Sequence, residues 1–351
     1  MAQNQYRYQK DLEYDLKSKE ILSELPPYIN DYYTSLMNSD GSAATRLNYL
    51  YDIRLFFRYL AGLPQFENID TCGITLADLD NLEMRDIESY MAALIRGELQ
   101  EGKRKTNSAN TRARKLSSIR SLYTYFGRDG RLKTNPAALV ETPKIKQQPV
   151  VYLDKEDVAA MLRVAYSGEG MSNRQLKYHE QTKLRDIAII TLLFGTGMRV
   201  SECVGIDLRH INFKNDYITV VRKGGDNDKV YFNQSVKDAL LDYIQLGRQC
   251  FNPYDEYADA LFLATSRQRI TTRSVEKLIH KYATMANLDK NIAPHKCRST
   301  YACFVYEATD HDLYAVKDSL HHASLETSKR YIGDAENRKK KAAKSIDGMF
   351  D

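Results

Sequence analysis

Residues 187–202 read Ile-Ala-Ile-Ile-Thr-Leu-Leu-Phe-Gly-Thr-Gly-Met-Arg-Val-Ser-Glu. The segment from Leu184 to Gly195 is nearly all apolar, which predicts a helix that is buried on every side. Gly195 and Gly197 then predict a turn that ends this helix, and Arg199 follows at the start of the next one. The sequence therefore sets a permanently charged guanidinium directly behind a core helix.

The apolar run inside this stretch, from Ile187 to Phe194, is far shorter than the ~20 residues that a membrane span needs. The first residues, Met1 to Arg7, contain no apolar signal core, so neither membrane insertion nor secretion is expected. The five cysteines are odd in number and scattered, and no CxxC pair is present, so neither a disulfide framework nor a zinc site is indicated. We expect a cytoplasmic protein.

The chain has 351 residues, which predicts about two domains. With 43% hydrophobic and 28% charged residues, the composition excludes collagen-like, coiled-coil and wholly disordered chains. The net charge of +5 is unevenly distributed, because residues 1–100 carry −7, residues 101–150 carry +9 and residues 151–351 carry +3. Such a basic block is typical of nucleic-acid contact, which would make the protein nucleoid-associated. A solvated basic face beside an acidic one is the alternative.

A helix predicted over residues 108–126 carries much of this basic block. Its apolar face consists of Leu116, Ile119, Leu122, Tyr123 and Phe126. The residues on its other faces, together with two lysines farther along, are the candidate DNA-binding residues: Arg112, Arg114, Lys115, Ser118, Arg120, Lys144 and Lys146. A surface helix whose basic side chains face only solvent is the alternative.

The expected fold is mainly α, with a helical N-terminal domain and a mixed, mostly helical second domain. A proline-containing stretch without a helical stripe marks the boundary as an extended linker. The expected parts are a polar segment at 1–24 (a short helix or a mobile arm), a helical domain at 25–140, a linker at 141–152, a second domain at 153–335 and a tail at 336–351.

A small antiparallel β-meander is predicted inside the second domain. Its strands are the short runs 210–213, 216–221 and 230–233, and residues 222–229, rich in Gly and Asp/Asn, join the last two. Asp154 is expected to cap the first helix of this domain.

Four motifs succeed one another in this half: Gly195 to Glu202, Lys223-Gly-Gly at the tip of the predicted hairpin, His295-Lys-Cys-Arg, and the run from Leu320 to Ile332. Arg199 and Arg298 offer rigid, bidentate donors to a phosphate that gains negative charge during transfer. A phenol has a pKa of about 10, so Tyr331 would need cationic surroundings to attack at neutral pH. No carboxylate cluster is apparent, so the sequence implies no metal or other cofactor.

The order and spacing of the four motifs resemble the tyrosine recombinase (phage integrase) family over most of residues 150–335. The basic, helical N-terminal half looks like the core-binding domain of that family. The resemblance implies that Tyr331 is the nucleophile of a 3′-phosphotyrosyl intermediate and that Arg199 and Arg298 clamp the phosphate. The other matched positions are His295, His322 as the second His/Trp position, Lys223 as the general acid and Glu202 as a supporting carboxylate.

Two departures from the family pattern stand out. The chain has Leu320-His321-His322 where the family usually has Leu-Gly-His, and the spacing favours His322 as the phosphate-facing histidine. The hairpin after Lys223 is acidic, which leaves Arg222 and Lys229 as weaker rivals for the proton donor. Two histidines match no motif and are expected on the surface: His179 and His311.

The resemblance implies a site-specific recombinase that binds double-stranded DNA target sites. It would act as a homotetramer through a Holliday junction, either in integration and excision of a mobile element or in dimer resolution. A need for accessory proteins stays open. The alternatives are a type IB topoisomerase and a non-catalytic DNA-binding protein of the same fold. The tail, with Ile346, Met349 and Phe350 at helical spacing, would dock on a neighbouring protomer or pack on its own domain.

Overall fold

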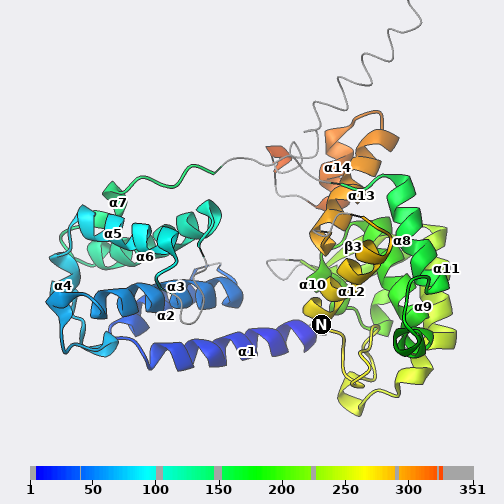
Figure 1. The fold of residues 1–351 in the computed structure, drawn as a ribbon, viewed down its shortest axis with the longest axis horizontal. Coiled ribbons are helices and arrows are strands. Elements are labelled where there is room, and N and C mark those ends of the chain that lie inside the picture. Colours follow the sequence, from blue (N-terminus) through cyan, green and yellow to red (C-terminus); the bar gives the residue numbers. More distant parts are fainter. Residues whose placement is uncertain are drawn as a thin grey trace, which may run out of the picture. The chain divides into compact units, whose positions relative to one another are not determined.

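The computed structural model describes residues 5–39, 41–99, 106–145, 152–222, 227–288, 292–321 and 324–326. The chain divides into two compact units, residues 1–147 and 148–351 (Figure 1). Both units are mainly helical, and the sheet that the described residues form lies in the second unit. The predicted mainly α fold with a small antiparallel meander is confirmed.

The described residues of the first unit form α-helices and two 3-10 helices. Its helices are α1 (Gln5–Leu22), α2 (Ile29–Met37), α3 (Ala43–Ala61), η1 (Pro64–Phe66), η2 (Thr71–Gly73), α4 (Leu76–Asp80), α5 (Met84–Arg96), α6 (Ala109–Arg128) and α7 (Pro136–Leu139). For the opening segment the sequence allows a short helix or a mobile arm. The structure shows a helix, α1, which packs against α3.

Helices α3 and α6 supply much of the core of this unit. Each begins at a serine whose side chain accepts a backbone N–H of the first turn, Ser42 for α3 and Ser108 for α6. All five apolar residues predicted for the inner face of α6, from Leu116 to Phe126, are fully buried. The amphipathic pattern of the basic helix therefore predicts its buried face correctly.

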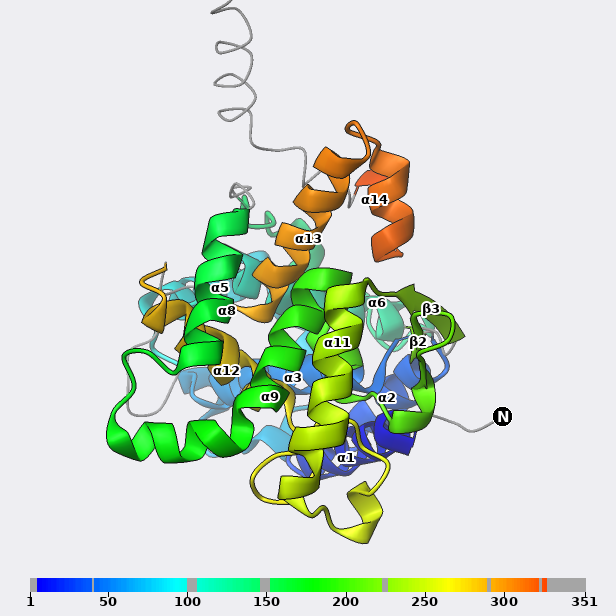
Figure 2. The same ribbon diagram turned by 90° about the vertical axis from the view of Figure 1, so that its right-hand side faces the viewer.

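The second unit is built around the long helix α9. Its elements are α8 (Lys155–Ser167), α9 (Asn173–Thr196), α10 (Val200–Val204), η3 (Leu208–His210), β1 (Ile211–Asn212), β2 (Tyr217–Val221), β3 (Asn227–Tyr231), α11 (Gln234–Asp242), η4 (Tyr243–Gly247), η5 (Arg248–Phe251), η6 (Asp255–Tyr257), α12 (Thr272–Met285), α13 (Pro294–Ala308) and α14 (Leu313–Leu320). Helix α9 packs against α8, α11 and α13 (Figure 2), which explains why its second half is apolar all round.

The sheet is a three-stranded antiparallel meander in the order β1-β2-β3. Ile218 pairs with Val230, and both side chains are buried, so one face of the hairpin packs inward. Val221 pairs with Asn227 at the far end of the two strands, and residues 223–226 between them lie outside the described residues. Asp154 caps α8 as predicted, accepting the Asp157 N–H at 2.7 Å.

The expectation for His179 was wrong, whereas His311 is exposed as expected. His179 is 1% exposed because α9 begins eleven residues before its apolar stretch and carries the imidazole inward. There its Nδ1 lies 3.3 Å from the Tyr282 hydroxyl, which donates to Asp186. The Tyr282 hydroxyl thus replaces water for Nδ1, whereas Nε2 is buried without a hydrogen-bond partner among the described residues.

Candidate active site

The site is organised by the turn that ends α9. Gly197 caps this helix in the left-handed conformation, with φ 61° and ψ 15°. A Cβ atom at Gly197 would lie 2.4 Å from Cδ1 of Tyr301 on α13, so both the backbone and the packing require glycine. Two residues later, Arg199 is the N-cap residue of α10.

Arg199 and Glu202 are joined by two contacts across this short helix. The carboxylate of Glu202 accepts the backbone N–H of Arg199 at 2.8 Å and its Nη1 at 2.9 Å. Arg199 keeps 46% of its side chain exposed, whereas Glu202 keeps 7%. The buried carboxylate therefore orients an arginine whose guanidinium still reaches solvent.

Arg222, just beyond β2, is the second cation on Glu202, with Nη1 at 2.7 Å from Oε1. Burial alone would raise the pKa of Glu202, but the charges of Arg222 and Arg199 and the Arg199 N–H outweigh it, and the pKa is lowered. Glu202 is therefore ionised at neutral pH. The supporting role expected for Glu202 fits these contacts.

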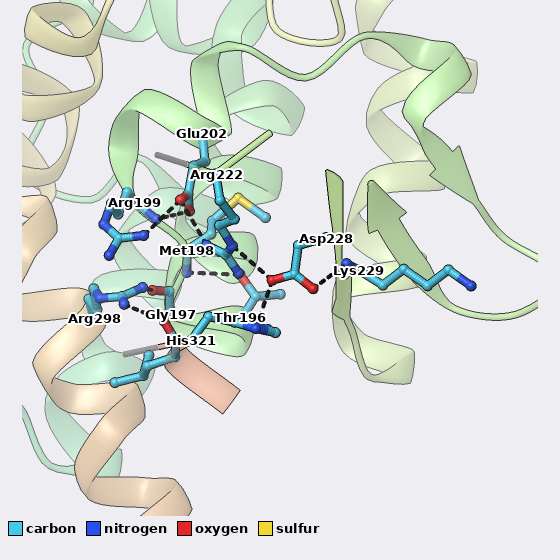
Figure 3. A network of polar contacts seen from close by, with 11 residues as sticks. Thr196, Gly197, Met198, Arg199, Glu202, Arg222, Asp228, Lys229, Arg298 and His321 are labelled. Atoms are coloured by element: carbon cyan, nitrogen blue, oxygen red, sulfur yellow. Dashed lines mark hydrogen bonds and ion pairs between the residues drawn. The ribbon is translucent and has the colours of Figure 1, made fainter. Parts of the chain in front are cut away.

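Arg298 is 5% exposed and lies in the first two turns of α13. Its Nη1 donates to the carbonyl of Gly197 at 2.6 Å, and its Nη2 donates to the carbonyl of Leu320 at 2.7 Å. These bonds tie the end of α9 to the end of α14 and orient the guanidinium without neutralising it. Figure 3 shows Arg199 and Arg298 on the same side of the turn at Gly197.

Asp228 on β3 links the hairpin to the end of α14 (Figure 3). Its Oδ2 lies 3.0 Å from Nε of Arg222 and 2.7 Å from Nδ1 of His321, and its Oδ1 accepts the N–H of Lys229 at 2.8 Å. His321 follows α14 in the left-handed conformation, with φ 51° and ψ 52°. The residue that stands in place of the family's glycine therefore adopts the conformation that glycine favours.

The structure brings Arg199, Glu202 and Arg298 together at one turn. His295 is exposed on the first turn of α13, one turn before Arg298 as the spacing predicted. The other predicted catalytic residues lie outside the described residues: Lys223, His322 and Tyr331. The tail residues Ile346, Met349 and Phe350 lie outside them too.

The predicted DNA-binding residues fall into two groups. Lys115 and Ser118 are buried and bind Asp52 on α3, Lys115 Nζ at 2.9 Å and the Ser118 hydroxyl at 3.0 Å. Arg114 also pairs with Asp52, but 43% of its side chain is exposed. Burial removes Lys115 and Ser118 from the side chains available to DNA, because a carboxylate inside the core already uses them.

Arg120 is half-buried and likewise binds within its own unit. It donates to the carbonyls of Ala137 and Val140, with Nε 2.9 Å from the former, and to the Thr142 hydroxyl at 2.8 Å. Three candidates remain on accessible or partly accessible faces, and a fourth lies outside the described residues: Arg112, Arg114 and Lys144, then Lys146. The basic helix thus divides its cations between the core and the surface.

Sequence reasoning missed the ionic partners of the site. Arg222 and Lys229 were considered as proton donors, but Arg222 bridges Glu202 and Asp228, and the ammonium of Lys229 lies 4.6 Å from the centre of the Tyr217 ring. The acidity of the hairpin was visible in the sequence. Its purpose, a carboxylate for Arg222 and His321, depends on contacts across the fold.

Each of the two units matches a known protein family model. The model of the "Phage integrase family" matches residues 152–338, and that of the "Phage integrase, N-terminal SAM-like domain" matches residues 29–130. Tyrosine recombinase XerC of Caldanaerobacter subterraneus subsp. tengcongensis is 30% identical over 334 residues, which cover 90% of this chain and 86% of that protein. Tyrosine recombinase XerS of Streptococcus thermophilus is 30% identical, over 94% of this chain and 98% of the relative.

Solved structures share the fold. XerH site-specific recombinase bound to palindromic difH substrate has a TM-score of 0.62 at 18% identity, over 86% of this chain and 78% of that chain. A lambda integrase dimer bound to a COC′ core site has a TM-score of 0.62 at 17% identity, over 88% and 95%. The chain therefore belongs to the phage integrase family. Within it, the chain is a tyrosine-type site-specific recombinase, an enzyme that breaks and rejoins DNA strands. None of the helices formed by the described residues is long and apolar enough to cross a membrane.

Proposed function

We propose that this chain binds double-stranded DNA target sites and cleaves one strand through Tyr331, forming a 3′-phosphotyrosyl intermediate. Strand exchange then proceeds through a Holliday junction within a homotetramer on two synapsed sites. The observation that carries the proposal is the arrangement at the Gly197 turn. There a buried, rigid Arg298 and a solvent-reaching Arg199 are oriented by the protein before any substrate arrives.

The two arginines suit a phosphoryl transfer that gains negative charge in its transition state. Each offers planar, permanently charged donors, and a preoriented donor costs no rearrangement during the reaction. Arg298 is fixed by two carbonyls and Arg199 by Glu202, whose lowered pKa keeps it ionised. A guanidinium has five N–H donors in a planar fork, which suits it to hold the non-bridging oxygens of a phosphate.

The covalent step conserves the phosphodiester. The Tyr331 oxygen bonds to phosphorus, the bond from phosphorus to the 5′ oxygen breaks, and the phenolic proton passes to a histidine of the site, His295 or His322. Lys223 on the hairpin tip donates the proton that the departing 5′ oxygen takes up. The reverse sequence with a new 5′ hydroxyl rejoins the strand, so the reaction consumes no cofactor.

We propose that DNA contacts the first unit through the basic side chains that the core leaves accessible, Arg112, Arg114, Lys144 and Lys146. Lys115, Ser118 and Arg120 instead hold the helix that presents them. Alanine at Arg114 or Lys144 should weaken binding and lower the salt dependence of the affinity by about one charge each.

The test is covalent trapping on a nicked (suicide) duplex that carries the target sequence. Wild type should form a protein–DNA adduct, and Tyr331→Phe should form none while binding the duplex normally. Tyr314→Phe, at an exposed tyrosine of α14, is the matched control and should form adducts at the wild-type rate. An adduct with Tyr331→Phe would refute Tyr331 as the nucleophile, and binding without any wild-type adduct would favour a non-catalytic DNA-binding protein.

To assign the biological role, the target DNA sequence must be identified. Sequencing of trapped adducts from genomic DNA would identify it: sites at the ends of a mobile element indicate integration and excision, and a single chromosomal site indicates dimer resolution. Efficient relaxation of a supercoiled plasmid that lacks the target would instead favour a type IB topoisomerase activity.

A further inference from the structure

The carboxylate of Asp228 joins three segments that meet beside the active site. It contacts Arg222 just beyond β2, the N–H of Lys229 on its own strand, and His321 directly after α14. Asp228 keeps 26% of its side chain exposed and Arg222 keeps 12%, so the contacts are partly shielded from water. Such a pair is worth more than an exposed surface ion pair.

His321 occupies a position that favours glycine. With φ 51° and ψ 52°, a side chain there is strained, because the left-handed region is unfavourable for residues other than glycine. The imidazole makes a contact that glycine could not make, the 2.7 Å approach of Nδ1 to Asp228. This contact offsets the strain and fastens α14 to the hairpin.

In the sequence, Lys223 lies between the two strands of this hairpin, β2 and β3. Arg222 follows β2 and Asp228 lies on β3, and each is bound outside the hairpin, Arg222 to Glu202 and Asp228 to His321. The contacts therefore run from Arg199 through Glu202, Arg222 and Asp228 to His321 (Figure 3). On the far side of His321 the sequence continues to His322 and Tyr331.

We propose that Asp228 and His321 are positioning residues that clamp the β2–β3 hairpin to the end of α14 and thereby set Lys223 within reach of the departing oxygen. A general acid must lie within hydrogen-bond distance of the atom that it protonates, and a lysine on an unfastened hairpin tip would spend little time there. The inference rests on the proposed function, because it takes Lys223 as the proton donor.

The protonation state of the imidazole fits this role at neutral pH. Burial lowers the pKa of His321, and the charges of Arg222 and Arg298 lower it further, whereas Asp228 and Glu202 raise it, with a net decrease. A neutral imidazole with its proton on Nδ1 then faces the carboxylate, so the contact does not depend on a second positive charge beside Arg222.

The experiment measures single-turnover cleavage of the nicked (suicide) duplex and compares two leaving groups at the scissile phosphate. One substrate has the natural 5′ oxygen at the scissile phosphate and the other has sulfur there. A thiol has a pKa near 8.5, so a departing thiolate needs no proton. Loss of proton donation therefore slows cleavage of the oxygen substrate and spares the sulfur substrate.

The variants are Asp228→Asn and His321→Gly, with Lys223→Ala as the benchmark. Asparagine keeps the shape of aspartate, and glycine suits the left-handed backbone, so neither change should unfold the site. We expect both to cleave the oxygen substrate about tenfold or more slowly than wild type, because general acid catalysis contributes roughly 10²–10⁴-fold. On the sulfur substrate both should approach the wild-type rate, as Lys223→Ala should.

Asp216→Asn is the matched control. It removes an ion pair with Lys237, 2.8 Å long, that holds the same sheet at its opposite end, and it should cleave both substrates at the wild-type rate. Wild-type rates for Asp228→Asn and His321→Gly on the oxygen substrate would overturn the inference, and so would an equal loss on both substrates. Absence of any wild-type adduct on either substrate would refute the proposed function instead.

Discussion

Replacing Gly197 by alanine tests whether one turn positions both arginines. The residue ends α9 with φ 61°, its carbonyl accepts Nη1 of Arg298 at 2.6 Å, and the chain reaches Arg199 two residues later. We expect Gly197→Ala to destabilise the second unit and to displace Arg298 from its carbonyl partner, because the added methyl group collides with the ring of Tyr301.

The magnitude has two parts. The left-handed backbone costs alanine roughly 1–2 kcal/mol relative to glycine. The added Cβ would lie 2.4 Å from Cδ1 of Tyr301 and 2.9 Å from Cδ2 of Leu320, and forcing a methyl group into such space costs about 1–3 kcal/mol more. The expected loss is therefore about 2–5 kcal/mol of unfolding free energy.

The assay is urea unfolding of the full chain, with hydrogen exchange of α9 and α13 peptides to assign the transition to the second unit. Gly170→Ala is the matched control, because Gly170 has φ 80° and an added Cβ meets only Met285 Cε, at 3.8 Å. It should cost only the backbone part, about 1–2 kcal/mol. In a Tyr301→Ala background, the unfolding cost of Gly197→Ala should fall towards this value, with only the contact to Leu320 Cδ2 left in addition.

Equal costs for Gly197→Ala and Gly170→Ala would refute the reasoning, since they would mean that the ring of Tyr301 does not constrain the turn. A full cost for Gly197→Ala in the Tyr301→Ala background would refute it as well.

Three further changes probe the interior. Asp52→Asn leaves the ammonium of Lys115 buried without its carboxylate and should lower the unfolding free energy, measured with urea, by about 3–5 kcal/mol. Adding Lys115→Met should recover much of this loss. No recovery in the double variant would contradict the ion-pair argument. Burial, and then the charge of Lys281, lower the pKa of His179 below 6.5. On acidification the unfolded chain therefore binds a proton first, and the unfolding free energy should fall as the pH drops below 6.5. If His179→Gln shows the same dependence of unfolding free energy on pH as wild type, the argument is wrong. Arg120→Met should speed hydrogen exchange of residues 136–142, and unchanged exchange would show that the arginine does not hold this segment.

Local patterns predicted most of the elements, because they depend on neighbours in the sequence. The spacing of apolar residues identified the buried face of α6, and Asp154 identified the start of α8. The sequence does not locate the start of a helix whose first part is polar and whose second part is apolar. Helix α9 begins at Asn173, well before its apolar run, and the polar first part hid the burial of His179.

The basic helix shows why charge alone does not assign a role. Arg114 and Lys115 are adjacent in the sequence, yet one is 43% exposed and the other 10% exposed. The residue that draws Lys115 inward is Asp52, which lies 63 positions earlier on α3. The helical period could place Lys115 near the edge of the apolar face, but it could not supply its partner.

By itself the sequence determined the two-part helical architecture, the small meander, and the identity and order of Arg199, Glu202, His295 and Arg298. The tertiary structure alone decided how these side chains are held: Arg298 by the carbonyls of Gly197 and Leu320, and Glu202 and Asp228 by the shared Arg222. The reason is physical. Helices, caps and turns follow from interactions within a few residues, whereas a buried charge needs partners that only the packing of distant segments brings within about 3 Å.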